Sequence, residues 1–231
     1  MLDTVLVKSD MDWIAVCLSL RIAFASTALL VPFGVLLAWP IVCGCNRYRI
    51  ILETITSVSL VLPPTVIGFY LMVLMGPRSV IGMTLDSLVG VRLLFTFQGL
   101  LLTQMLVNLP FLLQPLATSL DSVDRRLLEA ASTLGSGKAG IYFRVALPMA
   151  WRGLLSGVIL SFTHAIGEFG VVLMIGGDLP GKTRTASIAL FDQVQTLDFK
   201  GANQTALLLL AIAFVGTVCN AWIRSKERLW T

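Results

Sequence analysis

Residues 129–135 read Glu129-Ala130-Ala131-Ser132-Thr133-Leu134-Gly135, and Leu147-Pro148 follows after eleven further residues. This stretch is a polar island between strongly apolar segments. Leu127, Ala131 and Leu134 recur at i, i+4 and i+7, which places apolar side chains along one face of a short helix. The pattern predicts a helix–turn–helix that lies outside the bilayer between two membrane spans.

The residue types at the ends of this helix predict its boundaries. Asp121 or Ser122 is placed to cap its start, and Gly135 to end it in a left-handed conformation. Small alanines let a helix sit deep in a cleft of another protein, and Pro148 is expected to start the next helix. An ordinary amphipathic helix at the membrane surface is the alternative interpretation.

The rest of the chain has the composition of an integral membrane protein. Of its 231 residues, 56% are hydrophobic and only 13% are charged, and the mean hydropathy is +0.87. The basic residues behind the net charge of +4 are dispersed, which does not favour nucleic acid as a partner. We expect one all-α transmembrane domain over residues 1–231, with a cytoplasmic loop at 118–150.

Apolar segments long enough to cross a bilayer recur along the chain. A short amphipathic helix from Trp13 is expected before the first span, and Asn108-Leu109-Pro110 is expected to break the third. Residues 176–203 read as a polar loop. The predicted spans are about 22–42, 57–75, 93–116, 154–175 and 205–222.

The distribution of basic residues predicts the orientation of the chain. If the amino terminus lies outside, Arg47, Arg49, Arg125, Arg126, Lys138, Arg144, Arg152, Arg224, Lys226 and Arg228 fall on one side, against Lys8, Arg78, Arg92, Lys182, Arg184 and Lys200 on the other. The side richer in Lys and Arg is the cytoplasmic one. The loop at 118–150 and the carboxyl terminus are therefore expected in the cytoplasm.

Two regions are candidates for a transport pathway. Leu62-Pro63-Pro64-Thr65 frees backbone carbonyls at membrane depth, which is tolerated where the backbone lines a cavity or is buried in protein; a structural kink is the alternative. His164 and Glu168 lie four residues apart and are expected to share a helix face. Ionisable groups within a span are costly, so they mark either function or a tie between helices. The pathway candidates are Pro63, Pro64, Thr65, Ser161, Thr163 and Glu168.

The sequence offers no pattern for a metal site or for soluble catalysis. Cys17, Cys43, Cys45 and Cys219 lack the spacing of zinc ligands and are expected to be reduced thiols. His164 has no metal-binding neighbours with suitable spacing. We expect no catalytic residue and no metal.

The Glu-Ala-Ala-x-x-x-Gly pattern with Leu-Pro after its spacer resembles the cytoplasmic loop signature of bacterial ABC importer permeases. The resemblance implies a type I permease fold whose loop helix docks on a separate ATPase subunit, which holds ATP and Mg, so that this chain needs no cofactor. The residues to which it assigns the coupling are Glu129, Ala130, Ala131, Gly135, Leu147 and Pro148.

A narrower resemblance covers nearly the whole chain. Gly167-Glu168-Phe169-Gly170 resembles the sulfate and molybdate permease branch, and residues 62–68 and 180–185 resemble its molybdate members. The compact length also favours molybdate. The resemblance implies a homodimer in lipid in the bacterial inner membrane, two ATP-binding subunits, an extracytoplasmic molybdate-binding protein, and import by alternating access.

Alternative functions remain open on the sequence. The cargo could be tungstate, or sulfate or thiosulfate. A membrane-embedded enzyme with His164 and Glu168 as acid and base, and a membrane scaffold that transports nothing, are alternatives from other classes.

Overall fold

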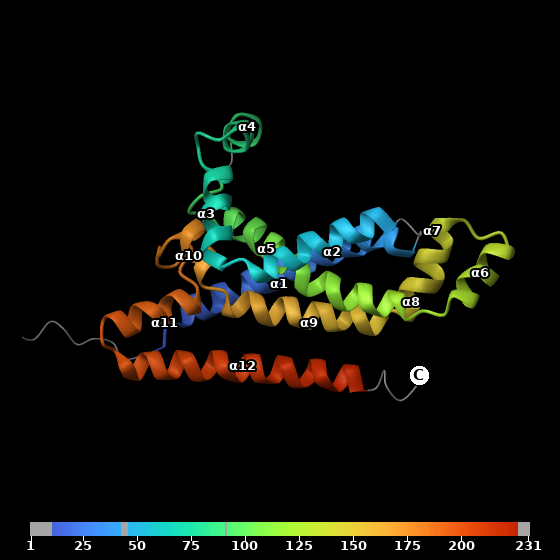
Figure 1. The fold of residues 1–231 in the computed structure, drawn as a ribbon. Coiled ribbons are helices and arrows are strands. Elements are labelled where there is room, and N and C mark those ends of the chain that lie inside the picture. The colour runs from blue at the N-terminus through green and yellow to red at the C-terminus, as the bar shows by residue number, and fades with distance from the viewer. Residues whose placement is uncertain (1–10, 43–45, 91, 226–231) are drawn as a thin grey trace, which may run out of the picture. The chain divides into compact units, whose positions relative to one another are not determined.

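The computed structural model describes residues 11–42, 46–90 and 92–225, and those residues form helices and turns without a strand (Figure 1). Three helices, α1, α5 and α12, are long and apolar enough to span a membrane, and the count reaches five if the bent pairs α2 with α3 and α7–α8 with α9 are each one span. The helices are α1 (Trp13–Val42), α2 (Asn46–Val61), α3 (Pro64–Met75), α4 (Val80–Val89), α5 (Phe97–Asp121), α6 (Arg125–Thr133), α7 (Lys138–Ile141), the π-helix η1 (Tyr142–Ala146), α8 (Leu147–Met149), α9 (Trp151–Gly167), α10 (Gly170–Gly176), α11 (Ala186–Gln195) and α12 (Phe199–Ser225).

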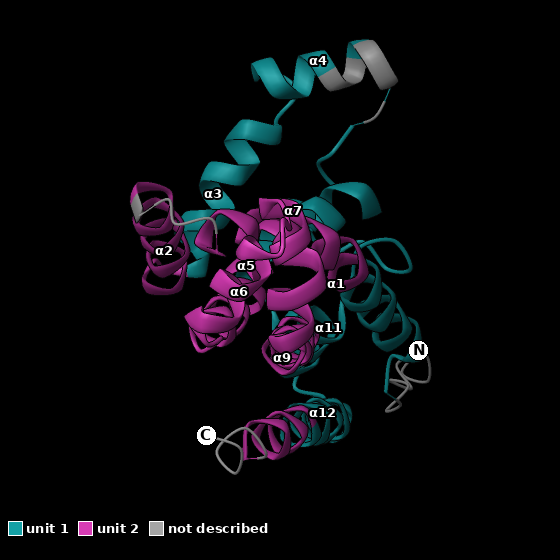
Figure 2. Ribbon diagram, turned by 90° about the vertical axis from the view of Figure 1, so that its right-hand side faces the viewer, with its two compact units in different colours: residues 1–25, 64–104, 165–215 teal, residues 26–63, 105–164, 216–231 magenta. Residues whose placement is uncertain are grey.

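The chain divides into two compact units, coloured separately in Figure 2. Unit 1 comprises residues 1–25, 64–104 and 165–215, and unit 2 comprises residues 26–63, 105–164 and 216–231. Each unit therefore draws on segments far apart in the sequence.

The prolines within α1 and α5 do not interrupt these helices. α1 runs unbroken from Trp13 through Pro32 and Pro40, so the separate amphipathic helix predicted before the first span is wrong. α5 likewise continues through Pro110, where the sequence predicted a break. A proline removes one backbone donor, but buried side chains around it, including Leu112 and Leu113, hold α5 in a continuous helix.

Breaks occur instead at two other places. α2 ends at Val61 and α3 begins at Pro64, so the structural kink considered as the alternative for the paired prolines is present. The predicted fourth span is divided, because α9 ends at Gly167 and α10 begins at Gly170. The predicted polar loop at 176–203 contains α11 and the start of α12. Cys43 and Cys45 lie outside the described residues.

Unit 2 is built around Tyr142, which is fully buried. Its hydroxyl donates to the Val35 carbonyl of α1 at 2.6 Å, and its ring stacks on Trp39 with centroids 5.8 Å apart. The core around it draws on α1, α5 and the segment that precedes α9: Ala38, Leu113, Leu116, Leu120, Ala146 and Ala150. This core ties the predicted cytoplasmic loop to the spans.

Two glycines let α5 and α9 approach each other closely. A Cβ added at Gly153 would lie 2.3 Å from the Ser119 Cβ, and one added at Gly157 would lie 2.6 Å from the Leu112 carbonyl oxygen. Gly153 and Gly157 stand four residues apart and face the same neighbour, the arrangement of small residues that membrane helices use for close packing.

Replacing Gly153 with alanine is expected to destabilise unit 2 by about 1–3 kcal/mol, because the added methyl group forces the two helices apart. The measurement is the midpoint of thermal unfolding of the purified protein in detergent. Gly167→Ala is the matched control, since a Cβ at Gly167 meets no atom within 4 Å. Equal unfolding midpoints for the two variants would show that the close approach of α5 and α9 at Gly153 does not contribute to stability.

Candidate functional site

The predicted loop helix is α6, and a side chain caps its start. The Asp124 carboxylate accepts a hydrogen bond from the backbone N–H of Arg126 at 2.9 Å. The predicted cap at Asp121 or Ser122 is therefore wrong, because α5 continues to Asp121 and leaves only a short turn before α6.

α6 ends at the predicted glycine. Gly135 has φ +83°, and its N–H donates to the Ser132 carbonyl at 3.0 Å, while the Ser136 N–H donates to the Ala131 carbonyl at 3.0 Å. This pair of bonds is a Schellman motif, which needs a left-handed residue and so favours glycine. The left-handed end predicted from the sequence is confirmed, and it turns the chain sharply into α7.

α6 presents most of its surface outward. It has no buried residue; Leu127 is 44% exposed and Leu134, just beyond its last residue, is 87% exposed. Only Leu128 packs against the core of unit 2, and Ala131 is half-buried, while Glu129 and Ala130 are exposed. Leu128 packs α6 against the core of unit 2, while Leu127 and Leu134 form an exposed apolar surface of the kind that binds another protein.

The second arm of the hairpin contains a π-helical turn before Leu147-Pro148. The Leu147 N–H donates to the Tyr142 carbonyl, five residues back. Pro148 has no N–H to donate, and the chain bends by 70° at Ala150 before α9 begins. Pro148 therefore lies at the start of the short helix α8, as the sequence predicted, and the longer helix α9 begins only after the bend.

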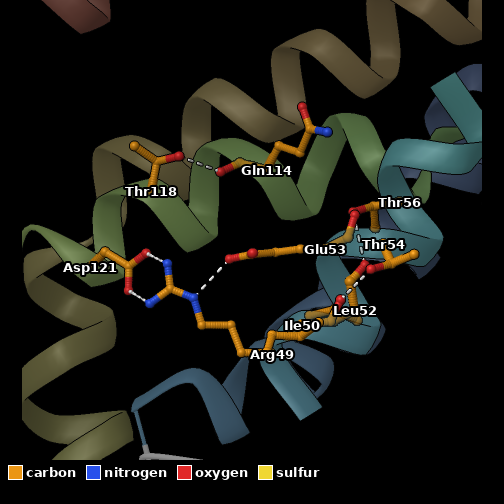
Figure 3. Close-up of polar contacts among 9 residues, drawn as sticks. All are labelled: Arg49, Ile50, Leu52, Glu53, Thr54, Thr56, Gln114, Thr118 and Asp121. Atoms are coloured by element: carbon orange, nitrogen blue, oxygen red, sulfur yellow. Dashed lines mark hydrogen bonds and ion pairs between the residues drawn. The ribbon is translucent and has the colours of Figure 1, made fainter. Parts of the chain in front are cut away.

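An ion-pair cluster that sequence reasoning missed joins α2 to the end of α5 (Figure 3). Arg49 donates through Nη1 and Nη2 to both carboxylate oxygens of Asp121, at 2.9 and 2.6 Å, and through Nε to Glu53 at 2.7 Å. Bidentate pairing fixes the guanidinium plane. Asp121 precedes the Asp124 cap by one turn, so the cluster fixes the base of the hairpin. Only tertiary structure brings Arg49 to Asp121.

Unit 1 holds three of the pathway candidates. Pro64 and Thr65 lie beside Gly170, where an added Cβ would be 3.3 Å from the Pro64 Cβ. Glu168 is buried in the break between α9 and α10; its carboxylate accepts from the Val171 N–H at 3.2 Å, and its carbonyl accepts from the Ser187 hydroxyl at 2.7 Å. These contacts tie the break to α10 and α11.

Unit 2 holds the remaining candidates. The Ser161 hydroxyl donates to the Asn108 carbonyl at 3.4 Å, and His164 Nδ1 lies 2.9 Å from Asn108 Oδ1. The His164 ring stacks on Phe111 with centroids 3.9 Å apart. Because α9 ends at Gly167, the prediction that His164 and Glu168 share a helix face is wrong. The exposed Pro63 ends a segment of this unit, and Thr163 lies beside Gly216.

The sequence contains a match to the P-loop spacing G-x-x-x-x-G-K-[ST] at residues 176–183. A P-loop follows a strand and points its N–H groups at phosphate. Here Gly176 ends α10, and the N–H groups of residues 182–184 all donate to the Leu179 carbonyl, at 3.0–3.1 Å. The Thr183 hydroxyl donates to the Gly176 carbonyl at 2.6 Å. This segment matches the sequence pattern of a P-loop but forms a closed turn, and it does not have the structure of a phosphate-binding loop.

An ion pair closes the same turn. Arg184 Nη2 donates to Asp178 Oδ2 at 2.9 Å, and this hydrogen bonding raises the pKa of Arg184 above its ordinary value. In the described part of the chain, His, Cys, Asp and Glu residues form no group that could hold a metal ion.

Comparison with known proteins places the chain among transport proteins. Residues 30–228 match the family described as binding-protein-dependent transport system inner membrane component. The chain is 40% identical over 207 residues to a molybdenum transport system permease protein of Azotobacter vinelandii, covering 90% of this chain and 92% of that protein. It is 32% identical over 220 residues to a probable sulfate transport system permease protein of Chlorella vulgaris, covering 93% and 81%. The fold resembles a chain of a bacterial alginate ABC transporter, with a TM-score of 0.69 at 16% identity, covering 94% of this chain and 78% of that one.

Proposed function

The chain belongs to the family of binding-protein-dependent transport system inner membrane components, and from this premise we propose that it is the permease subunit of an ATP-driven importer that takes molybdate into the cytoplasm. The observation that carries the proposal is an all-helical membrane chain that displays α6 as an outward-facing hairpin. The greater identity to the molybdenum relative, 40% against 32%, favours molybdate over sulfate.

ATP hydrolysis is carried out in this proposal by a partner ATPase that receives α6 in a groove. Glu129, Ala130 and the leucines at 127 and 134 face outward and are available for that contact. Gly135 sets the angle of the hairpin through its left-handed turn. Leu147 and Pro148 lie in the arm that returns to the spans, so movement of α6 is passed to α9 through the bend at Ala150.

Two copies of the chain and two ATPase subunits complete the transporter in this proposal. α2 carries an open groove lined by Glu53, Thr54 and Ser57 together with apolar residues such as Val58. Polar side chains on the face of a span are costly in lipid, which supports a neighbouring protein or water against this face. A binding protein delivers the oxyanion from outside, as the family description implies.

The proposed path crosses the multi-pass inner membrane protein from an external amino terminus toward the cytoplasmic hairpin and carboxyl terminus. The surplus of Lys and Arg near α6 and at the carboxyl terminus supports this orientation. Pro63, Pro64, Thr65, Ser161, Thr163 and Glu168 are the pathway residues in this proposal. Alternating access opens the path first outward, when ATP draws the ATPase subunits together, and then inward after hydrolysis.

Stimulated ATP hydrolysis by the complete transporter tests this function. The chain is reconstituted in liposomes with its partner ATPase and binding protein, and the binding protein is supplied empty, with molybdate or with sulfate. We expect stimulation by the molybdate-loaded protein only. Equal or greater stimulation by sulfate would contradict the cargo, and an absence of any complex with the ATPase would contradict the permease.

A further inference from the structure

Unit 2 contains a cavity of about 470 Å³ that none of the predicted pathway residues lines. Its polar lining comes from one face of α5, the residue directly after α5, the first part of α9 and the last turn of α12: Gln114, Thr118, Ser119, Ser122, Ser156 and Arg224. Apolar residues line it as well, namely Leu60, Phe111 and Leu160. One water molecule takes up about 30 Å³ in the liquid, so the volume holds a small ion with several waters.

The charge of this lining is positive. Among the described residues that line the cavity, Arg224 is the charged one, and none is an Asp or Glu. Among the residues that the structure describes, no carboxylate forms an ion pair with Arg224. The nearby cluster of Arg49, Asp121 and Glu53 has one more carboxylate than guanidinium, and both carboxylates are ion-paired with Arg49. In Figure 3 the amide of Gln114 points away from this cluster. A cavity with an unneutralised guanidinium attracts anions.

Hydrogen bonds within the walls decide which groups can donate into the cavity. The hydroxyls of Thr118, Ser122 and Ser156 donate to the Gln114 carbonyl, the Ser119 carbonyl and Asn220 Oδ1. Their hydrogens are therefore already committed within the protein. The Arg224 guanidinium and the Gln114 side-chain amide have N–H groups and no partner among the described residues. An arginine fork and an amide are donors that match the oxygens of a tetrahedral oxoanion.

The cavity adjoins the buried polar cluster of unit 2. Asn108, Phe111 and Gln114 follow one another at three-residue spacing along α5, so they share one helix face. Phe111 lines the cavity and also stacks on His164, which contacts Asn108. Phe111 therefore contacts both the cavity and the His164 ring of the Asn108–Ser161–His164 cluster.

We propose that this cavity is a binding site for a tetrahedral oxoanion group, held by the Arg224 guanidinium and the Gln114 amide. The proposal rests on the proposed function for its cargo and its orientation, which place the site at the cytoplasmic end of the path. Arg224 is exposed, so water and salt weaken its attraction. The site therefore receives an anion without trapping it, as release into the cytoplasm requires.

Binding of radiolabelled molybdate to the purified full-length chain in phosphatidylcholine nanodiscs, measured by equilibrium dialysis without ATPase or binding protein, tests the site. We expect saturable binding that Arg224→Gln and Gln114→Leu each weaken by about tenfold or more, since each removes donors to a charged ligand. Arg152→Gln is the matched control: it removes the same charge from the start of α9, but Arg152 lies over the Trp151 ring and does not line the cavity. Binding that is absent, or that is equal in the Arg224 and Arg152 variants, overturns free molybdate as the ligand.

A second arm separates a free oxoanion from the phosphate of a lipid. Native mass spectrometry counts the phosphatidylglycerol retained from mixed nanodiscs by the wild-type chain and by the two arginine variants. Retention lost only with Arg224→Gln supports the same oxoanion chemistry with a lipid as its source. If neither molybdate nor lipid depends on Arg224, the site is overturned. If the site is overturned but the complete transporter still responds to molybdate, the proposed function stands. If binding depends on Arg224 but the complete transporter shows no response to molybdate, the site stands and the proposed function is overturned.

Discussion

Replacing Leu134 with aspartate is expected to abolish uptake by the complete transporter while leaving the permease folded. Leu134 is 87% exposed, so its side chain does not stabilise the fold, and replacing it is not expected to lower the stability of the permease. In the proposed complex the same side chain enters a groove of the ATPase, where a buried unpaired carboxylate costs several kcal/mol. The measurements are co-purification of the ATPase with the permease and uptake of labelled molybdate into liposomes.

Leu197→Asp is the control for this substitution. Leu197 is also strongly exposed, at 72%, and it precedes α12 on the side proposed to be external. Its φ of +62° is tolerated by aspartate. We expect the Leu197 variant to retain the ATPase. If the Leu134 variant retains it equally well, α6 is not the docking surface.

Replacing Tyr142 with alanine is expected to destabilise unit 2 by about 3–5 kcal/mol, the range for removing a buried aromatic side chain. The ring contacts Trp39 and Phe143, with centroids 5.8 and 5.0 Å away, and its hydroxyl bonds to Val35. Truncation removes all three contacts and detaches the second arm of the hairpin from α1. The effect is read from the unfolding midpoint in detergent and from ATP hydrolysis that no longer depends on the loaded binding protein.

Tyr142→Phe separates packing from hydrogen bonding. It keeps the ring contacts and leaves the Val35 carbonyl without the phenolic donor, so a cost of about 1 kcal/mol is expected. Coupling should survive in this variant. Uncoupling as severe as in the alanine variant would mean that the hydrogen bond, and not the packed ring, transmits the movement of α6.

Local signals in the sequence determined much of the candidate site. The membrane class follows from composition, and the family from the Glu129-to-Pro148 pattern, and both are confirmed by the family match and the shared fold. The end of α6 follows from Gly135 because glycine has no Cβ and adopts the left-handed conformation more readily than any other residue. The break before Pro64 falls at two consecutive prolines, where two neighbouring backbone donors are missing, whereas the isolated Pro32 and Pro110 lie inside continuous helices.

Tertiary structure decided the features that depend on distant partners. Pro110 alone predicts a break in α5, yet packing around Pro110 keeps that helix continuous. In contrast, α9 ends at Gly167, directly before Glu168, which forms hydrogen bonds with α10 and α11. The pairing of Arg49 with Asp121 joins residues 72 positions apart, and the hydrogen bond from Tyr142 to Val35 spans 107. Spacing along one helix carries no information about such partners. The sequence by itself therefore determined the membrane-protein class, the family and the turn at the end of α6. Only the tertiary structure decided which residues anchor the hairpin and which side chains line the cavity beside Phe111, because both features require segments far apart in the chain to meet.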